Sequence, residues 1–186
     1  MKSLYGVFGA VGTWPDWERF FEIERGGMMR SFLALLLCYP ALWLVQTGVE
    51  THRARLLETD APQASVGLFV AIITIWLLSF TATAGATAML LGKTERLPLW
   101  FAARNWALAW LCVVLGAVFA SVRWLGLPFA IGNGALFAAY LGLLPIDIRL
   151  AMRAMGLPMG TAVLVACVIV STSLLALLSG VQLALG

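Results

Sequence analysis

Five apolar stretches, each long enough to cross a bilayer, constrain the fold of this chain more than any other feature. A membrane-spanning helix needs about 20 largely apolar residues to cross a hydrocarbon core of about 30 Å. The stretches cover residues 29–49, 66–91, 99–122, 125–148 and 161–185. The sequence therefore predicts an all-α, polytopic helical membrane protein with about five transmembrane helices.

The composition agrees with lipid as the main solvent. Of the 186 residues, 62% are hydrophobic and only 11% are charged, whereas about a quarter of a soluble domain is charged. The net charge is only +3, and the charged residues lie between the apolar stretches rather than in one basic patch. Nucleic-acid-binding proteins typically have such a basic patch. We expect the lipid bilayer of the inner (plasma) membrane as the surroundings, and no nucleic-acid partner.

The fourth stretch is the least uniform of the five. It contains Gly126, Pro128, Gly132, Asn133, Gly134 and Pro145. Four spans with a re-entrant segment at this place are therefore an alternative. After the fourth stretch, a glycine at 156 and a proline at 158 are typical of one helix ending and the next beginning.

The distribution of Lys and Arg predicts the orientation. With the N-terminus inside, nine of the twelve basic residues fall in inner segments and three, Arg53, Arg55 and Arg123, fall in outer ones. Cytoplasmic loops carry the excess of basic residues. We therefore expect the N-terminus inside and the C-terminus outside.

The sequence divides into a cytoplasmic N-terminal segment, 1–27, and a five-helix transmembrane domain, 28–186. In the segment, Thr13 can cap a helix in which Trp17 and Phe20 supply apolar bulk and Glu18 and Glu22 supply charge. Such an amphipathic helix can lie in the headgroup layer, or it can simply lead into the first span.

Small side chains dominate the end of the second stretch. They allow a neighbouring helix to approach closely, and threonines can hydrogen-bond across the contact. The predicted packing face consists of Ser79, Thr81, Thr83, Gly85 and Thr87. Internal packing is the favoured interpretation, and a self-association surface or a substrate-facing wall is the alternative. Under either, leucine at position 85 should be more disruptive than leucine at position 116.

Four polar residues are expected at membrane depth: Arg104, Asn105, Asn133 and Asp147. A charge at this depth is usually paired, reaches the interface, or is functional. Arg104 and Asp147 can meet if the third and fourth helices are antiparallel neighbours, although Arg149 and Arg153 compete for Asp147. We expect a structural or interface-seeking role for Arg104. Asn133 is expected to be the polar group farthest from the span ends and to serve packing.

No catalytic pattern is present in the sequence. It has one histidine, His52, and its cysteines, Cys38, Cys112 and Cys167, all lie in apolar stretches. These residues form no metal-ligand, nucleophile or phosphate-loop motif. We expect no enzyme activity, no metal and no cofactor. The lowest-ranked alternative is a catalytic subunit that uses Glu50, His52, Glu58 and Asp60.

The layout resembles the Yip-type five-helix membrane proteins. The similarity rests on Trp-Pro-Asp-Trp at 14–17 and on Tyr-Leu-Gly-Leu at 140–143 before a polar turn and a final apolar helix. Leu-Tyr-Gly at 4–6 is only a fragment of the signature of the eukaryotic members, without its flanking Asp and Pro. The resemblance implies a non-enzymatic protein that organises membranes or partner proteins, and it supplies no catalytic residues.

Two functions remain after these exclusions. The first is a non-enzymatic inner-membrane scaffold or accessory subunit, which acts through helix–helix contacts with other membrane subunits or with itself. The alternative is a small-solute transporter or channel, for which we expect a polar cavity near Asn133 and Arg104.

Overall fold

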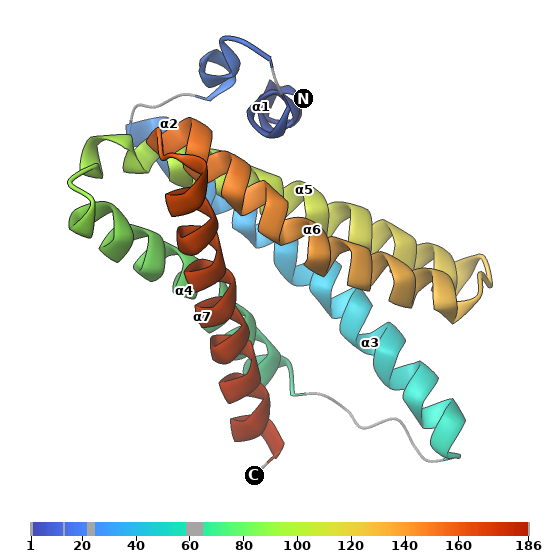
Figure 1. Cartoon of the computed structure of the whole chain (residues 1–186). Helices are drawn as coiled ribbons and strands as arrows, with labels where there is room; N and C mark the ends of the chain where they lie inside the picture. Colours follow the sequence, from blue (N-terminus) through green and yellow to red (C-terminus); the bar gives the residue numbers. More distant parts are fainter. Residues whose placement is uncertain (1, 13, 22–24, 59–64, 186) are drawn as a thin grey trace.

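Five long apolar helices make up most of this protein in a computed structural model of the chain (Figure 1). The structure describes residues 2–12, 14–21, 25–58 and 65–185. The α-helices are α1 (Lys2–Val11), α2 (Arg25–Ala34), α3 (Cys38–Leu57), α4 (Val66–Leu90), α5 (Leu97–Trp124), α6 (Phe129–Met155) and α7 (Met159–Leu185). Short 3-10 helices lie at η1 (Trp17–Phe20), η2 (Leu35–Leu37) and η3 (Thr94–Arg96). The predicted all-α, multi-pass architecture is confirmed.

The first span is longer than predicted. It runs as one helical segment over Gly27–Leu57, from α2 through η2 into α3. Pro40 explains the 3-10 turn, because a proline inside a helix removes a backbone hydrogen bond and its ring clashes with the carbonyl four residues earlier. The helix continues past residue 49 and ends at Glu58, which is left-handed with φ 52°.

The re-entrant alternative for the fourth stretch is wrong. Helix α6 is continuous and contains Pro145. It begins at Phe129 rather than at 125, because Gly126, with φ 68°, lies in the preceding loop. At its other end, Gly156 adopts the left-handed conformation with φ 61°, and α7 begins directly after Pro158. The predicted break at 156–158 is confirmed.

The long helices form two groups, α3 with α5 and α6, and α4 with α7 (Figure 1). The two groups come together at one end of the molecule and diverge toward the other. Helix α5 packs against α3 on one side and α6 on the other, whereas α4 pairs with α7. Helices α3 and α5 approach closely at Gly116, where a Cβ atom would lie 2.9 Å from the Cβ of Ala41. The two groups meet mainly through α6 and α7.

The N-terminal segment lies across one end of the bundle, which we call the α1 end (Figure 1). The expected helix after Thr13 is wrong: the α-helix is α1, and the stretch that follows holds only the turn η1. Trp17 and Phe21 are buried in the protein rather than facing lipid. Thr13 and Glu22 lie outside the described residues.

Arg153 of α6 binds this N-terminal segment. Its guanidinium donates hydrogen bonds to the backbone carbonyls of Gly9 (2.7 Å), Gly12 (2.6 Å) and Trp14 (2.6 Å). It also lies over the Trp17 ring, 5.6 Å from its centroid. The basic C-terminal end of α6 thus binds the chain's own N-terminal segment.

The orientation leads to a labelling prediction. In a cysteine-free background, Ser65→Cys is expected to react with an impermeant thiol reagent on intact cells, and Ser3→Cys is expected to react only after permeabilisation. The distribution of basic residues predicts that position 3 lies on the cytoplasmic side. The opposite labelling pattern would reverse the orientation.

Candidate functional site

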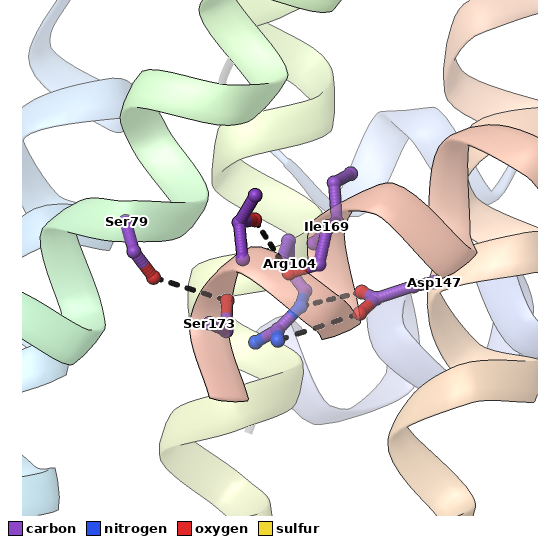
Figure 2. A network of polar contacts seen from close by, with 6 residues as sticks. Ser79, Arg104, Asp147, Ile169 and Ser173 are labelled. Carbon is purple, nitrogen blue, oxygen red and sulfur yellow. Dashed lines mark hydrogen bonds and ion pairs between the residues drawn. The ribbon is translucent and has the colours of Figure 1, made fainter. Parts of the chain in front are cut away.

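The candidate site is centred on an ion pair buried between α5 and α6. Nε of Arg104 donates to one carboxylate oxygen of Asp147 at 2.5 Å, and a terminal nitrogen lies 3.5 Å from the other (Figure 2). The two side chains are only 5% and 1% exposed. The Phe80 ring covers the guanidinium at 4.9 Å.

This pairing decides between the roles considered for Arg104. The side chain is buried against its partner and does not reach for the interface. Of the two competitors, Arg153 binds the N-terminal carbonyls and Arg149 is exposed. Residues 43 positions apart in the chain are therefore joined across two antiparallel helices.

Asn105 follows Arg104 but faces another helix. Its side-chain amide donates to the hydroxyl of Ser31 at 3.3 Å, and Ser31 donates to the carbonyl of Met28 at 2.7 Å. Both residues are almost fully buried. Asn105 therefore ties α5 to α2, and no pattern in the sequence singled out Ser31 as its partner.

The predicted packing face of the second span is partly correct. Ser79 donates to Ser173 of α7 at 3.0 Å (Figure 2), and the hydroxyls of Thr83 and Thr172 are hydrogen-bonded at 3.1 Å. Thr87 donates to the carbonyl of Thr83 within α4. This side of α4 is thus an internal contact with α7. The Ser-Thr-Ser run at 171–173, inside an apolar stretch, was a signal that the sequence reasoning missed.

Two other members of that face behave differently. The hydroxyl of Thr81 is buried without a hydrogen-bond partner among the described residues. Gly85 has open space around it, with no atom within 4 Å of a Cβ built there. The expectation that position 85 is more crowded than position 116 is wrong, because Gly116 is the glycine that touches a neighbouring backbone.

Asn133 is not the deep polar group that the sequence suggested. It lies in the second turn of α6, near the end opposite α1, and its side chain is exposed on the surface of the bundle. The error arises because α6 starts four residues later than predicted. Asn133 shares this surface with Gly134, whose Cβ position is open.

An apolar cavity of about 180 Å³ lies beside the ion pair, between the two groups of helices. Each of the five long helices contributes to its wall, with Leu42, Ile73, Leu108, Leu136 and Leu174 as examples. Arg104, Asp147 and Ser173 are among its few polar lining residues. This cavity is mainly apolar and Asn133 does not line it, so it is not the polar cavity expected near Arg104 and Asn133.

The described residues of the catalytic alternative, which lie near the C-terminal end of α3, do not form a cluster. Glu50 accepts a hydrogen bond from Gln46 at 3.0 Å, and His52 stacks on Phe129 at 3.9 Å. Glu58 ends the helix, and Asp60 lies outside the described residues. Across the described ranges, no three His, Cys, Asp or Glu residues gather as metal ligands. All three cysteines are free thiols.

Comparison with known proteins finds no matching family model, no matching curated protein and no matching solved structure.

Proposed function

We propose that this chain is a non-catalytic scaffold or accessory subunit of the inner membrane, which binds other membrane-protein helices through the exposed face of α6. The surface consists of Asn133, Gly134, Ala138 and Gly142, and we call it the α6 face. The resemblance to Yip-type proteins, which stays a prediction, implies the same class of function.

The observation that carries this proposal is the spacing of small residues on an unoccupied surface. Gly134, Ala138 and Gly142 recur every four residues, and Cβ atoms built at both glycines meet nothing within 4 Å. Small residues at this spacing let two helix backbones approach closely in lipid. Asn133, exposed beside them, offers an amide that can hydrogen-bond across such a contact. By contrast, the small-residue side of α4 that carries Ser79 and Thr83 is already occupied by α7.

Leucines at positions 134 and 142 together test the α6 face. The added side chains hold a partner helix away from Asn133, and we expect binding to weaken about tenfold, since an interhelical hydrogen bond of such a polar side chain contributes about 1–2 kcal/mol. The measurement is purification in mild detergent, with quantification of self-association and of co-migrating membrane proteins.

Gly160→Leu is the matched control, because Gly160 of α7 is equally open but lies outside the α6 face. It should keep whatever the natural protein binds, and neither variant should change the melting temperature. If the natural protein binds neither itself nor another subunit, or if both variants bind alike, the proposed function is wrong.

A further inference from the structure

We propose that the cavity beside Arg104 and Asp147 binds the carbonyl end of one acyl chain of a membrane phospholipid, with the ester carbonyl held by Arg104. This site lies between the two helix groups and is separate from the α6 face.

The size and lining of the cavity favour an apolar occupant. Its volume is about 180 Å³ and its walls are mostly aliphatic, and an apolar cavity of about 150 Å³ in a soluble protein stays dry and takes up benzene. Tyr140 lines the cavity and is 41% exposed, so one wall of the cavity lies at the outer surface of the bundle. In a bilayer, the apolar molecules present at that surface are acyl chains.

A buried donor gives the cavity a polar end. Nε and one terminal nitrogen of Arg104 bond to Asp147, and Arg104 also lines the cavity, so the other terminal nitrogen is the donor that can serve an occupant. In Figure 2 the end of the guanidinium points toward the side of α7 that carries Ser173, which also lines the cavity. Because Asp147 already balances the charge of Arg104, the donor suits a neutral acceptor such as an ester carbonyl better than a second anion.

The depth of Arg104 matches the position of such a carbonyl. Helix α5 has 28 residues, so it is about 42 Å long and extends roughly 6 Å beyond each side of a 30 Å hydrocarbon core. Arg104 is seven residues from the start of α5, about 10 Å along the axis, and so lies just inside the boundary of the core. Ester carbonyls sit where acyl chains begin, which is at that same boundary.

Filling the cavity tests the site. Tryptophan at Leu174, a lining residue, should displace the chain, whereas tryptophan at the neighbouring Leu175, which is 62% exposed, should not. Native mass spectrometry after detergent washing should find one tightly held diacyl phosphatidylethanolamine on the natural protein and on Leu175→Trp, and none on Leu174→Trp. Equal retention by the two variants would overturn the site.

A second arm uses the natural protein alone and does not depend on a variant folding. A dialkyl ether phosphatidylethanolamine has the same chains and headgroup but no carbonyl. Losing a hydrogen bond from a charged donor should weaken its retention about tenfold. Equal retention of the ether and ester lipids would overturn the assignment of Arg104 as the anchor.

Discussion

Gly116→Leu is expected to destabilise the protein by about 1–3 kcal/mol or more, since overpacking a filled contact has a cost of this size. Even a Cβ at this position would lie 2.9 Å from the Cβ and 3.0 Å from the Cα of Ala41. A backbone atom cannot turn aside as a flexible side chain can, so α3 and α5 must separate. Reversible unfolding in detergent, followed by circular dichroism, measures the loss.

The control for this variant is Gly85→Leu. It adds the same side chain to another span, at a glycine with no atom within 4 Å of the new Cβ, and should change the unfolding free energy by less than about 0.5 kcal/mol, as surface changes do. Equal destabilisation by the two variants would mean that α3 and α5 do not approach closely at Gly116.

The spans themselves could be predicted from the sequence because their signal is local. Length and apolar composition place α4 to within a residue of its observed end, and Gly156 with Pro158 marks the break before α7. The longer first span was missed because its last turns carry charged side chains that look like a loop. The shift in α6 was missed because Gly126 and Pro128, which form the loop, were counted as helix.

Helix pairing was harder to predict, and with it most of the site. Between membrane helices there is little hydrophobic driving force, because lipid is as apolar as leucine. Apolar periodicity therefore does not tell a face that meets protein from one that meets lipid. This is why Gly85 was expected to be crowded and Asn133 buried. Charge is the exception, since a buried cation needs a partner, and the meeting of Arg104 with Asp147 was the contact that the sequence suggested.

Removing one member of that ion pair is expected to be the most damaging change at the site. Arg104→Met or Asp147→Leu leaves the other charge 95% or more buried, with no counter-ion, and breaking a buried pair in this way costs about 3–5 kcal/mol. The double variant leaves no unpaired charge. It should therefore cost at least about 1 kcal/mol less than the sum of the two single variants.

The exposed pair between Arg96 and Glu18 provides the matched control for this cycle. Its nitrogen and oxygen are 3.6 Å apart, but the side chains are 51% and 42% exposed, so water competes for both charges and the coupling should be within about 0–1 kcal/mol. Both cycles are measured by unfolding in lipid bicelles, where the membrane depth of Arg104 is preserved. If the two charges share one buried contact, either single variant already removes that contact, so the two effects cannot add. Additive effects at Arg104 and Asp147 would therefore show that their charges are solvated independently.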